Sequence, residues 1–195
     1  DFCLSRGLGD VYKRQEIAAV LNKEFKMPDL SYTPSGEVKE GFKVDVKAND
    51  LCPRYIACYV SDVKIKEAPL WMKRRLALTG MDSISNIVDI TNYVLKEFGQ
   101  PMHAFDCNYL EGNEINVRRA ADGEKIVTLD SQEYELNSNN LVICDGVKAV
   151  ALAGVMGGLN SEIRDTTSAV MFESAKFARD NIRKTSRALG TQSDA

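Results

Sequence analysis

The chain has 195 residues, of which 44% are hydrophobic and 27% charged, and its formal net charge is −3. These values are typical of a globular protein with room for one good core, and the negative charge argues against binding of nucleic acid through a broad basic face. The longest strongly apolar run, 149–159, is shorter than the about 20 residues that a membrane-spanning helix needs. Because no secretory signal opens the sequence either, we expect a cytoplasmic protein with no membrane partner.

The cysteines are scattered along the chain. No Cys-x-x-Cys pair occurs, and the sequence contains a single histidine, so the usual ligand spacing of a zinc site is missing. We therefore predict no metal site, and cysteines that stay reduced as small apolar groups. The five cysteines are Cys3, Cys52, Cys58, Cys107 and Cys144.

The first predicted element is a helix. Residues 1–15 show no periodicity and stay unassigned, because they could be foreign sequence from cloning or a native irregular start. From Glu16, apolar residues recur at helical spacing as far as Phe25. The stretch 31–41 contains proline, serine and glycine and is predicted to be a loop or linker.

Two strands and a helix are predicted next. The segments 42–48 and 55–65 show the alternation and the β-branched and aromatic residues of strands. A helix is predicted over 68–80, with Pro69 near its first turn and Gly80 at its end.

The segment 85–99 predicts a second helix, with one buried face and clear boundaries. Ser85 or Asn86 could cap its start, and Gly99 ends it. The apolar face is formed by Ile87, Thr91, Val94, Leu95 and Phe98.

Short strands dominate the rest of the chain. A last helix is predicted over 178–189, ending at Gly190. Helices and strands come in blocks rather than in alternation, which predicts the α+β fold class. Basic clusters at 72–75 and 117–119, and a third formed by Arg183, Lys184 and Arg187, are predicted to be solvated faces. The predicted strands are 114–120, 124–130, 133–137, 141–145, 148–154 and 169–177.

His103, the single histidine, has several interpretations. It could be an ordinary loop side chain bonded to the backbone, or a group that gives and takes a proton near neutral pH. Cys107 follows four residues later, so a Cys–His nucleophile pair is a further candidate. The spacing alone does not bring the sulfur onto the imidazole.

A glutamate and a glycine cluster near the end of the chain are the other candidates. Glu173 lies inside an apolar strand, so its carboxylate must reach either solvent or a hydroxyl or amine in a pocket. Gly154, Gly157 and Gly158 follow a buried strand, without the fingerprint of a dinucleotide or nucleotide site. They serve either a tight turn with positive φ or the close approach of backbone N–H groups to a ligand.

Four segments together carry a resemblance to a known family. In their order and spacing, "LCPRYIA", "NIVDITNYVLKEFGQPMHAFD", "ALAGVMGG" and "FESAKF" closely resemble the β subunit of bacterial phenylalanyl-tRNA synthetase. The resemblance extends from about Glu16 to Ala195. It implies that 16–50 are the end of a preceding domain with a linker, and that 51–195 are a central editing domain truncated at its C-terminus. The implied fold is a layered β/β/α sandwich with mixed sheets and a few helices.

The resemblance also implies a function. The parent enzyme, phenylalanine--tRNA ligase, would be an α2β2 heterotetramer that joins phenylalanine to its tRNA with ATP and Mg²⁺. Its synthetic site would lie on the α subunit, so this part of the β subunit needs no cofactor of its own. The editing domain would hydrolyse tyrosyl-tRNA. Such a step is needed because a synthetic pocket that accepts phenylalanine rejects tyrosine, which only adds a hydroxyl, by only about 10²-fold.

The family's editing residues imply roles for residues of this chain. Glu173 would accept a hydrogen bond from the tyrosine phenol, and His103 would be the catalytic residue that positions the water or the terminal ribose. Gly157 and Gly158 would let the substrate pass close to the backbone. A bound water would attack the ester, so no covalent nucleophile is implied.

Two further positions complete the implied site, and two others depart from the family's pattern. Ala195 corresponds to a small residue lining the pocket, and Ser193 stands where the family often has threonine. Asp82 and Ser83 depart from an arginine and a proline that are frequent in the family, which puts contact with the tRNA end at that point in doubt.

Two rival functions stay open at this point. One is a noncatalytic RNA-binding or scaffolding domain, against which the retained His103 and Glu173 argue. The other is a free-standing aminoacyl-tRNA hydrolase acting in trans, against which the resemblance of 16–50 to a preceding domain argues.

Overall fold

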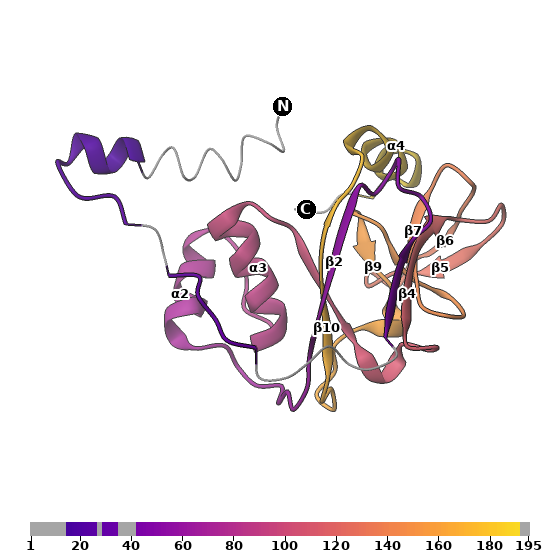
Figure 1. Cartoon of the computed structure of the whole chain (residues 1–195), viewed down its shortest axis with the longest axis horizontal. Helices are drawn as coiled ribbons and strands as arrows, with labels where there is room; N and C mark the ends of the chain where they lie inside the picture. The colour runs from indigo at the N-terminus through magenta and orange to yellow at the C-terminus, as the bar shows by residue number, and fades with distance from the viewer. Residues whose placement is uncertain (1–14, 27–28, 35–41, 192–195) are drawn as a thin grey trace.

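The structure is a computed structural model and describes residues 15–26, 29–34 and 42–191. Two β-sheets face each other, and two helices cover the outer side of one of them (Figure 1). The three-stranded sheet is antiparallel and consists of β2 (Arg54–Val60), β10 (Val170–Lys176) and β3 (Met102–Asp106), in that order.

The second sheet has five strands and is mixed. Its β1 pairs in parallel with β4, and the remaining pairs are antiparallel. In spatial order its strands are β1 (Lys43–Val46), β4 (Glu114–Arg119), β7 (Leu141–Cys144), β8 (Ala149–Leu152) and β9 (Met156–Gly157).

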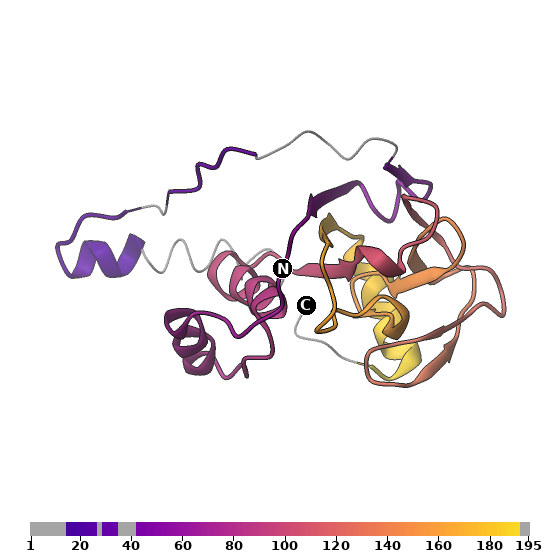
Figure 2. The same cartoon turned by 90° about the horizontal axis from the view of Figure 1, so that it is seen from below.

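The helices and the remaining strands lie around these sheets. Two of the helices, α2 and α3, sit beside the three-stranded sheet, whereas α4 lies at one end of the sandwich (Figures 1 and 2). Residues 15–20 form a further short helix. The elements are α2 (Leu70–Leu78), α3 (Asn86–Phe98), α4 (Arg179–Leu189), the two-stranded pair β5 (Lys125–Val127) and β6 (Glu133–Glu135), and the 3-10 turns η1 (Cys107–Tyr109) and η2 (Leu159–Ser161). No helix within the described ranges is long and apolar enough to span a bilayer.

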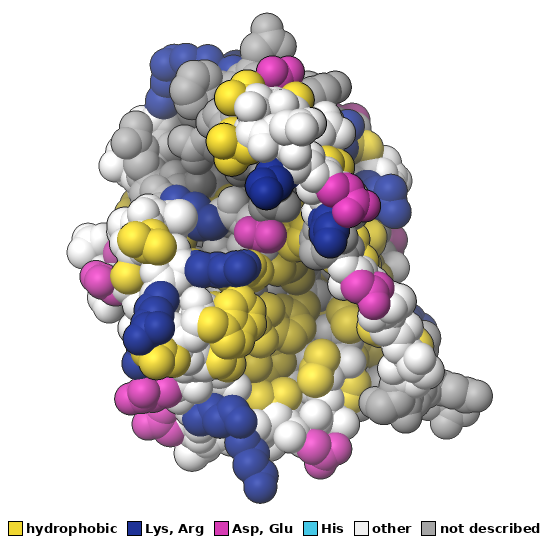
Figure 3. All heavy atoms as spheres, turned by 90° about the vertical axis from the view of Figure 1, so that its left-hand side faces the viewer, with side chains coloured by type: hydrophobic (Ala, Val, Ile, Leu, Met, Phe, Trp, Pro, Cys, Tyr) yellow, Lys and Arg dark blue, Asp and Glu magenta, His cyan; other side chains and the backbone are white. Residues whose placement is uncertain are grey.

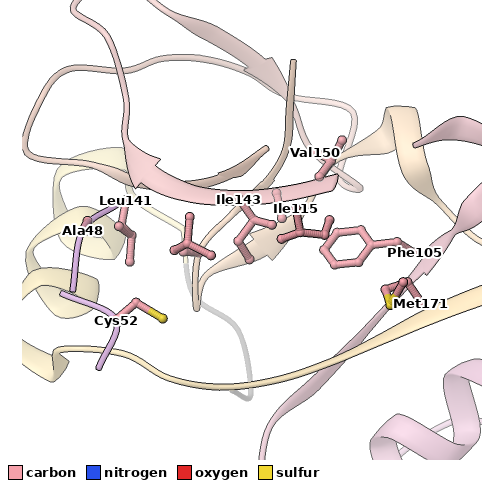
Figure 4. Packing of buried hydrophobic residues seen from close by; sticks show 11 residues of the cluster. Ala48, Cys52, Phe105, Ile115, Leu141, Ile143, Val150 and Met171 are labelled. Carbon is pink, nitrogen blue, oxygen red and sulfur yellow. The ribbon is translucent and has the colours of Figure 1, made fainter. Parts of the chain in front are cut away.

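The main core lies between the two sheets. Phe105 of β3 and Met171 of β10 point from one sheet toward Ile115, Ile143 and Val150 of the other (Figure 4). Alternate side chains of a strand point to opposite faces.

The opposite face of the three-stranded sheet packs against α3. Ala104 and Val170 are buried there with Ile87 of that helix. The three-stranded sheet is thus apolar on both faces, and the β/β/α layering follows from that.

Local signals explain the boundaries of α3. The Ser85 hydroxyl accepts a hydrogen bond from the Val88 N–H (3.4 Å), so Ser85 and not Asn86 is the cap. Gly99 ends the helix in the left-handed conformation, with φ of 70°. The fully buried Asp89 accepts hydrogen bonds from the Ser83 hydroxyl (2.5 Å) and from a backbone N–H. Ser83, which departs from the family's frequent proline, therefore has a structural partner in Asp89.

The predicted α+β class is confirmed, and two predicted elements need correction. The strand predicted over 55–65 ends at Val60, because the chain bends at Asp62, which adopts positive φ (57°). One of the alternatives for His103 was a loop residue, but its segment forms β3. Hydrogen bonds to β10 create this strand, and its own sequence shows no clear alternation.

We expect the substitution Phe105→Ala to lower the free energy of unfolding by about 3–5 kcal/mol, because it empties a fully buried site between the two sheets. Urea denaturation would measure the loss. A change below about 1 kcal/mol would show that this interface does not carry the core.

Candidate functional site

The register of the three-stranded sheet brings two predicted site residues together. Glu173 of β10 lies directly opposite His103 of β3. Directly opposed residues share a face of the sheet, and here it is the face that carries Phe105 and Met171 toward the second sheet. A carboxylate and an imidazole therefore lie side by side between the sheets.

A cavity of about 680 Å³ opens at this point. This volume is within the usual range for small-molecule sites. Both sheets and α4 contribute to its walls, and Glu173, His103 and Gly157 all line it. Its apolar walls include Ile143, Leu152, Val155, Met156, Phe177 and Ile182.

Glu173 is almost completely buried, with 6% of its surface exposed. The Tyr55 hydroxyl donates a hydrogen bond to its Oε2 (3.1 Å), and the structure shows no donor to Oε1 among the described residues. Burial raises the pKa of Glu173 to about 7, and the Tyr55 hydrogen bond partly offsets this effect. Burial and the nearby carboxylate together raise the pKa of Tyr55 well above its usual range. One carboxylate oxygen of Glu173 is thus free to meet a ligand.

The His103 ring is held by packing. It meets the Phe105 ring edge-on, with centroids 4.6 Å apart. Its Nε2 is buried and has no hydrogen-bond partner within the described part of the chain. Burial lowers the pKa of His103 to about 4, so the ring is neutral at pH 7. The interpretation of His103 as a loop residue bonded to the backbone is therefore wrong.

The three glycines have different roles. A Cβ on Gly157 would lie 2.3 Å from Cε1 and 2.5 Å from Nε2 of His103, so the imidazole occupies the space of the missing side chain. Gly158 donates its N–H to the Val150 carbonyl (2.8 Å), and that oxygen leaves no room for a side chain. Gly154 adopts positive φ, as a tight turn requires. Only Gly154 and Gly157 line the cavity, so this geometry gives no support to the substrate contact expected of Gly158.

The other predicted residues lie apart from the cavity or outside the described ranges. Cys107 lies in η1 beyond the end of β3 and does not line the cavity, so the Cys–His pair has no support here. Asp82 is exposed. Ser193 and Ala195 lie outside the described residues. Across the part of the chain that is described, no three potential metal ligands gather.

Sequence reasoning missed Tyr55. The alternation of β2 places this residue on the inner face of the sheet, and the pairing of β2 with β10 brings it beside Glu173. The aromatic residue in a strand-like pattern was visible, but its partner depends on a register that only the fold supplies.

An exposed aromatic side chain beside an arginine forms a second surface feature, on α2. Trp71 is half exposed there, and its ring meets the Tyr93 ring edge-on at 5.4 Å. The Arg75 guanidinium lies 5.6 Å from the centre of the Trp71 ring. Figure 3 shows hydrophobic side chains gathered on the side of the molecule that carries α2, with Lys and Arg around them.

Comparison with known proteins decides the family. The family described as "B3/4 domain" matches residues 51–195, which is most of the chain. The chain belongs to the B3/4 domain family. This B3/4 chain is 48% identical over 182 residues to the phenylalanine--tRNA ligase beta subunit of Syntrophus aciditrophicus, covering 93% of the chain and 23% of the relative. With the Bacillus cereus subunit it shares 47% identity over 194 residues, covering 99% and 24%.

A solved structure supports the fold of this B3/4 domain. The crystal structure of an N-terminal fragment of the phenylalanyl-tRNA synthetase beta-subunit from Pyrococcus horikoshii matches with a TM-score of 0.54. The match covers 82% of this chain and 52% of that one, at 12% sequence identity. At this identity the likeness concerns the fold alone. The chain spans about a quarter of the length of its curated relatives.

Glu173 and His103 should impose opposite pH dependences on the stability of the B3/4 domain. The pKa of Glu173 rises from 4.5 to about 7, so the folded state binds more protons than the unfolded state in that window. The contribution of Glu173 to the free energy of unfolding therefore falls as the pH rises from about 4.5 to about 7. The pKa of His103 falls from 6.5 to about 4, so the folded state binds fewer protons and stability rises with pH.

We expect the two single variants to separate these slopes. Glu173→Gln should leave stability rising from about pH 4 to about pH 6.5, whereas His103→Gln should leave it falling from about pH 4.5 to about pH 7. Urea denaturation over this range would measure both, with the unsubstituted chain as control. Parallel curves for the two variants would contradict the opposite shifts.

Proposed function

We propose that this B3/4 domain is part of a phenylalanine--tRNA ligase β subunit and hydrolyses tyrosyl-tRNA, the mischarged ester. The names of the relatives, at 47–48% identity, support the parent enzyme. One observation carries the hydrolytic role: a buried carboxylate with a free oxygen lies opposite a neutral imidazole in one cavity.

Glu173 can select tyrosine over phenylalanine by hydrogen bonding. Its Oε1 would accept the phenolic hydroxyl of a tyrosyl group, as its Oε2 already accepts the hydroxyl of Tyr55. A phenylalanyl group would bury the same carboxylate without giving it a donor, which costs about 1–3 kcal/mol or more for a charged group. A site that hydrogen-bonds a substrate hydroxyl discriminates far more strongly than one that only excludes it.

His103 can hold the water that attacks the ester. Its ring lines the cavity, and a ring nitrogen of the neutral imidazole would accept a hydrogen bond from that water. The water oxygen bonds to the ester carbonyl carbon, the bond from that carbon to the ribose oxygen breaks, and the ribose oxygen takes up a proton. The products are tyrosine and a free 3′ end. Because burial keeps the pKa of His103 low, orientation of the water matters more than proton abstraction.

The wider assembly belongs to the same proposal. The parent would be an α2β2 enzyme of the cytoplasm that charges phenylalanine-specific tRNA, with ATP and Mg²⁺ used at the synthetic site of its α subunit. The ester hydrolysis would draw on water and the side chains of this cavity.

We expect Glu173→Ala to lower the ratio of kcat/KM for tyrosyl-tRNA to that for phenylalanyl-tRNA by at least about tenfold, because one charged hydrogen bond to the phenol is lost. Deacylation of the two esters would measure it. Glu133→Ala, in the exposed strand β6, is the matched control and should keep the ratio. An unchanged ratio in Glu173→Ala would remove Glu173 from this role.

We expect His103→Ala to slow tyrosyl-tRNA hydrolysis by about 10²-fold, because the attacking water loses its acceptor. The variant should stay folded with a moderately lower unfolding temperature, since the substitution empties the space of a buried ring but also removes an unpaired buried nitrogen. Unfolding at a much lower temperature with turnover intact would show that His103 has only a packing role.

A further inference from the structure

Three cationic residues line the cavity toward α4. Lys176 ends β10, and Arg179 and Arg183 lie on the helix that follows. All three are exposed at the surface, whereas Glu173 lies buried further along the same strand. We call these three residues the cationic rim.

The spacing of α4 turns both arginines toward the cavity. Arg179, Ile182, Arg183 and Ser186 all line it, and residues at such offsets share one helix face. Ile182 fixes the orientation of that face, because its side chain lies 3.2 Å from where a Cβ on Gly154 would be. The two arginines are one turn apart, about 6 Å along the helix axis.

The cationic rim has no counter-ion in the described part of the chain. Other cations of the protein do have one: Arg118 binds Glu124, and Arg119 binds Asp50. No described carboxylate lies within salt-bridge distance of any of the three rim residues. Glu173 is the one acidic residue that lines the cavity. An entrance with three unneutralised cations favours a ligand that brings negative charge.

We propose that the cationic rim binds phosphodiester groups of a single-stranded RNA 3′ end whose terminal aminoacyl group enters the cavity. This inference rests on the proposed function. Two guanidinium groups one helix turn apart suit the repeated charges of a nucleic-acid strand. A duplex is too wide to reach Glu173 and His103 between the sheets, so the strand must be single. The overall charge of −3 is no obstacle, since the contact is local.

Binding of uncharged RNA tests the rim directly. The probe is a single-stranded oligonucleotide with the sequence of a tRNA 3′ end, measured by fluorescence anisotropy with the full chain at several salt concentrations. Arg183→Glu should weaken binding at least about tenfold and lower the salt slope by about 0.7 for each phosphate that the rim no longer neutralises. Lys184→Glu makes the same charge change on a neighbouring residue of α4 that does not line the cavity, and it should change binding less than about twofold.

Equal weakening of RNA binding in both variants would indicate a diffuse electrostatic effect and would overturn the proposal that the cationic rim binds RNA. Binding that stays unchanged in Arg183→Glu would overturn it too. A circular dichroism melt confirms that each variant is folded. Should Arg183→Glu unfold, Arg179→Gln and Arg183→Gln replace it and should each weaken binding at least about threefold.

Measuring hydrolysis of two esters distinguishes failure of the rim proposal from failure of the proposed function. The two substrates are tyrosyl-tRNA and 3′-tyrosyl-adenosine, which has no phosphate. In Arg183→Glu the ratio of kcat/KM for the first to the second should fall at least about tenfold, and in Lys184→Glu it should not change. A preserved ratio in Arg183→Glu overturns the rim while the proposed function stands. If the unsubstituted chain hydrolyses neither ester, the proposed function fails, and the binding comparison alone decides the rim.

Discussion

The pairing of β10 with β3 is the constraint on which the site depends. It sets Glu173 opposite His103, and it places both on the face that meets the five-stranded sheet. Because side chains alternate along a strand, a slip of one residue would turn one of the two toward α3. The apolar residues on both faces of the sheet oppose such a slip, since Phe105 and Ala104 would exchange environments. The core thus fixes the register, and the register assembles the site.

Burial sets the charges inside the cavity, and exposure preserves those at its mouth. Water is excluded from Glu173 and His103, which disfavours the charged form of each. The imidazole is neutral as a result, and the carboxylate titrates close to neutral pH. At the mouth, Arg179 and Arg183 are exposed to solvent. The electrostatic field therefore runs from a positive entrance to an interior that carries at most one negative charge.

The sequence predicted those features that depend on local chemistry. A cap at Ser85 or Asn86, the glycine that ends α3 and the α+β class all follow from spacing and residue type, and the structure selects Ser85. β3 and Tyr55 were missed for a common reason: a short strand and a buried side chain take their identity from partners distant in sequence. The meeting of Glu173 with His103 was expected from the resemblance alone, because periodicity says nothing about which strands become neighbours.

The hydrogen bond from Tyr55 has a consequence for selectivity. It holds the Glu173 carboxylate in one orientation before any ligand binds, and it occupies only one of the two carboxylate oxygens. A tyrosyl ring that arrives would find an acceptor already aimed, with no side chain to rearrange and little rotational freedom left to lose. Under the proposed function, the phenol of Tyr55 would thus act as a template for the phenol of the substrate, and the preorganised carboxylate would favour a tyrosyl over a phenylalanyl group.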